Sequence, residues 1–199
     1  MGAAGLQINF SHNFHEVWDK RDTAVSTAGA NIGYAKRGRT LVYMRPTMPM
    51  PWTYRHASKE WRAFLDDAKE RMGLVSDNAA YTAVDGVFQT FRRRLTAQQG
   101  LDFASVLPSV LRAIFVQNWD VTGPPLCFGE REELIEEVKS LRRDHNQTPD
   151  NAIEATAWAL WRATNHRDLR SILDQLPEPA RAFWQVDVED AAELQQRII

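Results

Sequence analysis

Two histidines near the start of the sequence are the first side chains that could bind a metal ion. His12 and His15 stand three residues apart and Glu16 follows them, so a helix would place both imidazoles on one face, as in many zinc sites. The order His-x-x-His-Glu matches neither the His-Glu-x-x-His motif nor its inverse, and no third ligand is evident. We therefore predict no metal site, and we expect no cofactor.

Cys127 is the only cysteine and thus the only candidate thiol nucleophile. Its neighbours Pro124, Pro125, Leu126 and Phe128 are apolar, and apolar surroundings disfavour the reactive thiolate. We predict that Cys127 packs against these neighbours. A single cysteine cannot close an internal disulfide, which favours a reducing compartment, so we expect a cytoplasmic protein.

Runs of charge are the next candidates for catalysis or phosphate binding. Three pairs of neighbouring acids fall on the polar faces of expected helices: Asp66-Asp67, Glu132-Glu133 and Glu136-Glu137. Catalytic carboxylates are normally partly buried, so we interpret these pairs as solvent-exposed. The run Arg92–Arg94 suits a helix C-terminus better than a nucleic-acid contact, and the sequence has no glycine-rich phosphate motif. These features favour a protein without enzymatic activity.

Arg112 and Arg181 are the best candidates for binding an anion. Each follows the proline of a Leu-Pro pair by four residues. In a cleft between two helical units, the two guanidinium groups would hold an anionic ligand. We favour the alternative that each arginine bonds carboxylate or carbonyl groups of its own unit, with Asp77 and Asp150 as the leading partners.

The two arginines belong to a longer internal repeat. The matching segments are 77–79 with 150–152, both Asp-Asn-Ala, and 107–115 with 176–184, both Leu-Pro followed by Arg-Ala. Upstream, Phe64-Leu65 corresponds in pattern to Leu134-Ile135. Such repeats indicate two copies of one supersecondary unit. We therefore predict an all-α fold in which a tandem duplication of a four-helix unit packs into one compact helical domain.

Hydrophobic periodicity locates the helices of each unit. One stripe contains Trp61, Phe64, Leu65, Ala68 and Met72, and we expect Ser58 to cap this helix and Gly73 to end it. A second stripe runs from Ala80 to Phe91. Thr96 and Gln99 then form a capping box for a third helix from Ala97 to about Leu107, and Pro108 starts a fourth that ends near Gln117.

Composition divides the chain into five segments. We predict a basic N-terminal extension at 1–50, helical unit 1 at 51–118, a Pro/Gly linker at 119–129, helical unit 2 at 130–186 and a C-terminal helix at 187–199. The extension is expected to be partly disordered, hairpin-like or folded back, with Met50 as an alternative start. Trp52 and Trp119 flank the units, where we expect them to cover the seam between units or to contact a partner.

The charge is small overall but unevenly distributed. The net charge is −2, with residues 1–55 basic and the remainder acidic. This balance makes nucleic acid an unexpected partner. No apolar stretch is long enough to span a bilayer, so no membrane partner is expected. A protein partner or a homo-oligomer is compatible with this composition.

The repeated pattern resembles the bacterial family catalogued as domain of unknown function 2267. The resemblance covers about residues 57 to 186 and rests on the repeated Asp-Asn-Ala and Leu-Pro segments. It implies a compact helical duplication in bacterial cytoplasm and supplies no catalytic residues. We predict a non-enzymatic protein-interaction module. The alternative is an enzyme or small-molecule binder with an anionic ligand between the units, and the candidate binding residues on either view are Arg112, Arg181 and Trp119.

Overall fold

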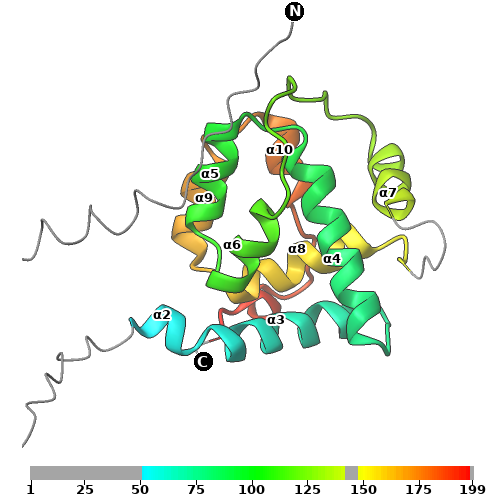
Figure 1. The fold of residues 1–199 in the computed structure, drawn as a ribbon. Helices are drawn as coiled ribbons and strands as arrows, with labels where there is room; N and C mark the ends of the chain where they lie inside the picture. The colour runs from blue at the N-terminus through cyan, green and yellow to red at the C-terminus, as the bar shows by residue number, and fades with distance from the viewer. Residues whose placement is uncertain (1–50, 142–147, 198–199) are drawn as a thin grey trace, which may run out of the picture. The chain divides into compact units, whose positions relative to one another are not determined.

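The computed structural model describes residues 51–141 and 148–197, and every regular element within them is a helix. The helices are α2 (Trp52–Arg55), α3 (Ala57–Arg71), α4 (Asp77–Arg92), α5 (Ala97–Ser105), α6 (Ser109–Val116), α7 (Arg131–Ser140), α8 (Ala152–Ala163), α9 (His166–Leu173), α10 (Glu178–Phe183) and the 3-10 turn η2 (Ala191–Leu194) (Figure 1). The predicted all-α class is confirmed. The expected hairpin, His12 and His15 lie outside the described residues.

Local sequence signals set most helix ends. Ser76 accepts a hydrogen bond from the backbone N–H of Ala79 at the start of α4. At the start of α5, Thr96 and Gln99 form both bonds of the predicted capping box. Gly73 follows α3 with a φ of +67°, a left-handed conformation that glycine adopts without a steric cost. These three signals confirm the predicted start of α5 and end of α3, and they account for the start of α4.

The predicted cap of α3 is wrong. Ser58 is the second residue of the helix, and the N-cap position belongs to His56, whose side chain makes no capping bond. The short helix α2 leads directly into α3, and the backbone N–H of His56 bonds to the carbonyl of Trp52. The hydrogen-bonded turn of α2 thus runs directly into α3, and α3 begins without a side-chain cap.

An aromatic cluster joins the two halves of the chain in one core. The ring of Phe91 on α4 lies 5.0 Å from that of Phe103 and 5.1 Å from those of Phe183 and Trp184, measured between centroids. All four side chains are buried. Offset and edge-on ring pairs at these distances add about 0.5–1.5 kcal/mol each beyond their buried area. Both halves therefore contribute to one hydrophobic core.

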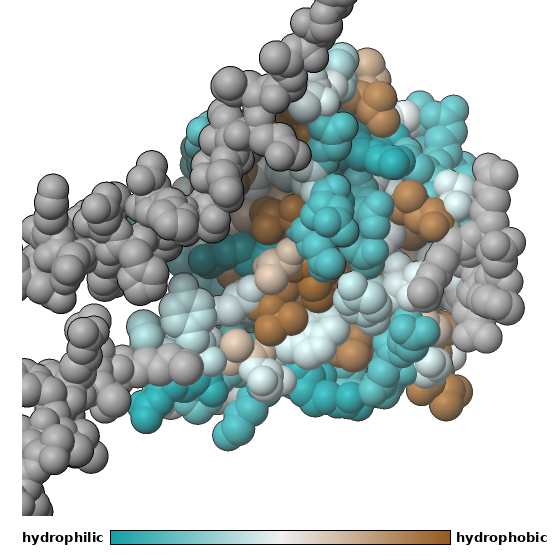
Figure 2. Space-filling view, in the orientation of Figure 1, coloured by the Kyte–Doolittle hydropathy of each residue, from teal (hydrophilic) through white to brown (hydrophobic). Residues whose placement is uncertain are grey.

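Helices that are distant in sequence lie side by side around this core. α3 packs along α8, and α4 packs against both α7 and α8 (Figure 1). Each half presents four helices in the same order, with a Leu-Pro pair before α6 and before α10. This order agrees with the predicted duplication, which stays a prediction. On the face drawn in Figure 2, exposed hydrophobic side chains form separate groups among hydrophilic ones.

The linker is held to the end of α4 through its backbone. The amide of Leu126 donates to the carbonyl of Arg93 at 2.9 Å, and Arg94 donates through Nε to the carbonyl of Cys127 at 3.1 Å. The Cys127 side chain is exposed, so the predicted packing role is wrong. Main-chain bonds fix the linker, and its side chains can therefore face solvent.

The predicted helix at 187–199 is also wrong. Its described part contains a single 3-10 turn at Ala191–Leu194. The amide of Arg197 donates to the carbonyl of Arg162 at 2.9 Å, and Arg162 donates to the carbonyl of Glu193 at 2.7 Å. Because these bonds tie the tail to the end of α8, its backbone does not continue as a helix.

Candidate binding groove

A wide hollow in the described part of the chain is a groove beside α10. It has a volume of about 830 Å³ and is bordered by the end of the linker, the first turns of α7 and one side of α10. Phe128, Pro179 and Ala182 provide its accessible apolar surface, above the side chains of Leu134 and Phe183. Leu134 and Phe183 are buried, whereas Glu130, Glu178 and Gln185 on its rim are exposed. We call this hollow the α7–α10 groove.

Acidic side chains dominate the polar rim of the α7–α10 groove. Four carboxylates line it, from Glu130, Glu154, Glu178 and Asp187, against the single guanidinium of Arg131. Glu130 is the N-cap residue of α7, and Glu178 is the first residue of α10. A helix N-terminus carries a partial positive charge that stabilises a carboxylate. The groove therefore has a net charge of −3 without a folding penalty at these two positions.

Arg131 lies against the apolar surface of the groove. Its guanidinium carbon is 5.7 Å from the centre of the Phe183 ring, and NH1 donates to the carbonyl of Phe183 at 3.2 Å. Burial lowers the pKa of Arg131, and the charges of Glu154 and Glu132 oppose this shift. An arginine remains charged at neutral pH under such a shift. Arg131 thus contributes a fixed positive charge within an acidic surrounding.

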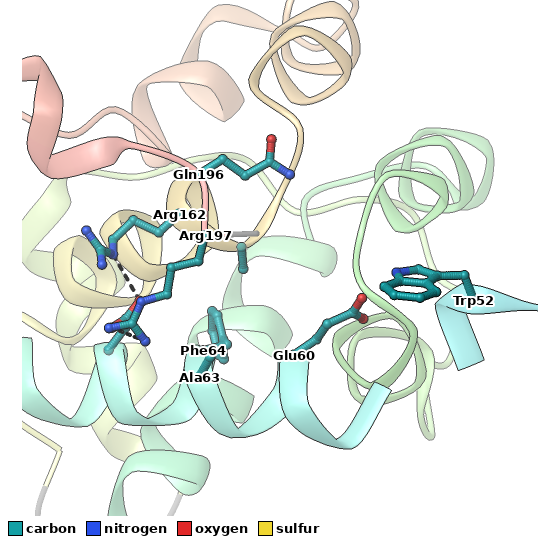
Figure 3. A pocket seen from close by; sticks show the side chains of 9 residues that line it. Trp52, Glu60, Ala63, Phe64, Arg162, Gln196 and Arg197 are labelled. Carbon is teal, nitrogen blue, oxygen red and sulfur yellow. Dashed lines mark hydrogen bonds and ion pairs between the residues drawn. The ribbon is translucent and has the colours of Figure 1, made fainter. Parts of the chain in front are cut away.

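A second hollow, of about 190 Å³, lies where the C-terminal tail crosses α3 and α8 (Figure 3). Arg162 and Arg197 stand at one end of it, and Trp52 and Glu60 stand at the other. Both arginines bind Asp67, with Nε of Arg162 at 2.9 Å and NH1 of Arg197 at 3.2 Å. The charged groups at that end are therefore already paired with one another.

Asp67 corrects the interpretation of the acid pairs as solvent-exposed. Its side chain is 5% exposed, whereas that of Asp66 is 43% exposed. Periodicity places the two residues on adjacent sides of α3, and α8 covers only the side that bears Asp67. The buried acid is a structural ion-pair partner that links α3 to α8 and to the tail.

Arg112 and Arg181 each make their described contacts within their own half of the chain. Arg112 donates to the carbonyls of Ala104, Ser105 and Leu107 at 2.9–3.1 Å, which satisfies the C-terminal carbonyls of α5. Arg181 is exposed, and its nearest acid is Asp174 at 3.7 Å. Neither arginine lines the two hollows described above.

The predicted pairing of these arginines with Asp77 and Asp150 is wrong. Asp77 accepts hydrogen bonds from Lys69 and Arg62, each at 2.6 Å. Asp150 forms an ion pair with Lys139. In both halves, a lysine near the end of one helix meets the aspartate at the start of the next. The predicted carbonyl contacts of Arg112 within its own unit are present, and the carbonyls belong to the end of α5 and the turn after it.

Trp119 fills space beside α5, next to Gly100. Its ring lies 5.8 Å from that of Phe115. A Cβ atom at Gly100 would stand 2.0 Å from Cη2 of Trp119, so a glycine is required at this close approach. Trp119 also lines a hollow of about 370 Å³ beneath the linker.

The described residues offer no evident metal centre. Within 51–141 and 148–197, no three His, Cys, Asp or Glu side chains are grouped closely enough to bind a metal ion.

The three arginines of the run Arg92–Arg94 all bind groups of the protein itself. Arg92 donates to the carbonyl of Phe115, and Arg93 and Arg94 bind Glu137 at 3.2 and 2.7 Å. None of the helices in the described part is long and apolar enough to cross a membrane.

Sequence reasoning missed the α7–α10 groove. Its lining comes from the linker, α7, α8 and α10, and only packing brings these segments together. One signal was present, since the region after residue 55 is acidic overall. The excess of acidic residues did not indicate which of them would lie close together without ion-pair partners.

Comparison with known proteins identifies one matching family model. The model, described as an uncharacterized conserved protein (DUF2267), matches residues 61–183. The matched region begins in α3 and ends with α10, so it includes the core and most of the groove. No curated protein matches the sequence.

Proposed function

This chain belongs to the family of uncharacterized conserved proteins described as DUF2267, and we propose that it is a non-enzymatic protein-interaction module. The α7–α10 groove would receive a segment of a partner protein. Recognition would combine an apolar contact at the floor with polar contacts at the rim, the usual composition of protein interfaces.

The shape and composition of the α7–α10 groove carry this proposal. Small-molecule sites enclose most of their ligand, whereas the rim residues Glu130, Glu178 and Gln185 are exposed to solvent. An open groove of about 830 Å³ with Phe128, Pro179 and Ala182 in its surface suits an extended or helical segment that places one large side chain inside.

An anionic ligand bound between the two units has less support. The guanidinium group of Arg112 already donates hydrogen bonds to three carbonyl groups, and Arg181 is an exposed side chain near Asp174. The α7–α10 groove itself is acidic and would repel an anion. Of the three acid pairs considered for catalysis, two are held in ion pairs, and the third, Glu132-Glu133, is exposed.

Site-specific photocrosslinking tests the proposal. A benzophenone amino acid would replace Ala182, which is exposed and lines the groove, or Ala113, an exposed alanine on α6 outside the groove. We expect a discrete adduct from position 182 alone, and its crosslinked peptide, made synthetically, should bind the purified chain. Filling the groove with Ala182→Trp should abolish that binding, whereas Ala113→Trp should not. Equal adducts from both positions, or binding that survives Ala182→Trp, would refute the proposal.

A further inference from the structure

Three carboxylates on the rim of the α7–α10 groove are unpaired. Within the described residues, the side chains of Glu130, Glu178 and Asp187 have no hydrogen-bond or ion-pair partner. The fourth acid, Glu154, is bound by Arg71 at 2.9 Å. Among the other described acids, some are paired, as Asp66 is with Arg62, and some, such as Glu70 and Asp168, are not; the groove differs in bringing three unpaired acids around one hollow. The groove therefore concentrates carboxylates whose hydrogen-bonding capacity is unused.

The groove surface already accommodates a guanidinium group. Arg131 lies over the ring of Phe183 and donates to its carbonyl. An aromatic face attracts a cation, and a guanidinium can stack on it while its edge donates hydrogen bonds. The remaining aromatic wall, Phe128, is half-buried. It leaves an apolar surface for an incoming side chain next to the unpaired acids.

From this juxtaposition we infer that the occupant of the α7–α10 groove is a basic peptide segment, in which arginine or lysine residues flank a large apolar side chain. This inference rests on the proposed function. The cations would pair with Glu130, Glu178 and Asp187, and the apolar side chain would cover Phe128 and Ala182. The net charge of −3 on the groove disfavours acidic segments and nucleic acid by repulsion.

A divalent cation is a weaker fit to the same acids. Metal binding requires several oxygen ligands to converge on one point, and no acids within the described ranges are grouped in that way. Carboxylates spread around a groove are better matched by charges spread along a peptide. The apolar floor would also have no role in binding a metal ion.

Selection from a random peptide library tests the inference without assuming a partner. Phage displaying peptides of about twelve residues, a length sufficient for groove recognition, would be selected on the purified full chain. Enriched peptides would then be measured by fluorescence anisotropy. We expect enrichment of arginine or lysine beside an aromatic or branched aliphatic residue, and binding that weakens as salt rises from about 50 to 500 mM.

Charge reversal at the rim supplies the matched comparison. We expect Glu130→Lys/Glu178→Lys to weaken the selected peptides by about ten-fold or more. The control Glu70→Lys/Asp168→Lys reverses two exposed acids outside the groove, one of which also lies near a helix N-terminus, and it should leave affinity unchanged. Circular dichroism of both variants would verify their folding.

The outcomes separate this inference from the proposed function. Neutral or acidic peptides that bind and are blocked by Ala182→Trp would overturn the basic occupant while leaving the groove as an interaction site. A library that yields no peptide sensitive to Ala182→Trp would count against both. Competition by spermidine at the same concentration as a selected peptide would indicate a site for small polyamines and would also overturn the inference.

Discussion

Replacing Asp67 with asparagine should destabilise the fold strongly. The Asp67 side chain is 5% exposed and is held by Arg162 Nε at 2.9 Å and Arg197 NH1 at 3.2 Å. Asp67→Asn preserves the shape of the side chain but removes its charge. The guanidinium of Arg162, whose side chain is 18% exposed, would then lose its counterion in a largely desolvated position.

The structure sets the size of this effect. Removing one partner of a buried ion pair costs about 3–5 kcal/mol. Arg162 would keep its bond to the carbonyl of Glu193 at 2.7 Å and its place 4.6 Å from the centre of the Trp158 ring. We therefore expect the lower end, about 3 kcal/mol, which corresponds to a fall in Tm of about 6–12 °C for a domain of this size.

Urea denaturation followed by tryptophan fluorescence would measure the free energy of unfolding. The control is Asp66→Asn on the same turn of α3, where the acid is 43% exposed and pairs with Arg62, so the cost should stay below about 1 kcal/mol. Arg197→Met should fall between the two because that side chain is 47% exposed. Equal costs for Asp67→Asn and Asp66→Asn would refute the reasoning that burial makes the Asp67 pair structural.

Further predictions concern the other close contacts. Gly100→Ala should destabilise the chain by about 1–3 kcal/mol and shift the fluorescence of Trp119, because the new Cβ would lie 2.0 Å from the ring. The control is Gly123→Ala, whose new Cβ would have no atom within 4 Å. Equal stabilities of the two variants would contradict the contact. Arg112→Met should cost about 1.5–3 kcal/mol in urea melts through its three lost carbonyl bonds, whereas the exposed Arg181→Met should cost below about 0.5 kcal/mol, and the reverse order would overturn this assignment. Hydrogen bonds from Lys69 and then Arg62 hold the pKa of Asp77 below its ordinary 3.8. The stability from this group is thus complete above about pH 3.8 and lost as pH falls through the lowered pKa; thermal melts of the wild type and Asp77→Asn should converge there, and a constant difference would refute the linkage.

The sequence by itself determined the helical class and most helix positions. Periodic apolar residues in the stripe from Ala80 to Phe91 predict α4, and the Thr96–Gln99 capping box predicts the start of α5. Gly73 ends α3 where the pattern indicates. These features were predictable because each depends on residues within a turn or two of one another, and the repeated Leu-Pro segments also indicated the family.

Only the tertiary structure decided which side chains meet across the molecule. Asp66 and Asp67 are adjacent acids that were both expected to be exposed, yet the packing of α8 buries Asp67 and leaves Asp66 43% exposed. The tail follows the end of α8 instead of forming a helix, because Arg162 and Arg197 tie it there. The acids of the α7–α10 groove come from separate segments whose proximity depends on how α7, α8 and α10 pack. A contact between residues that are distant in sequence depends on the shape and burial of the whole core, so short-range sequence patterns do not predict it.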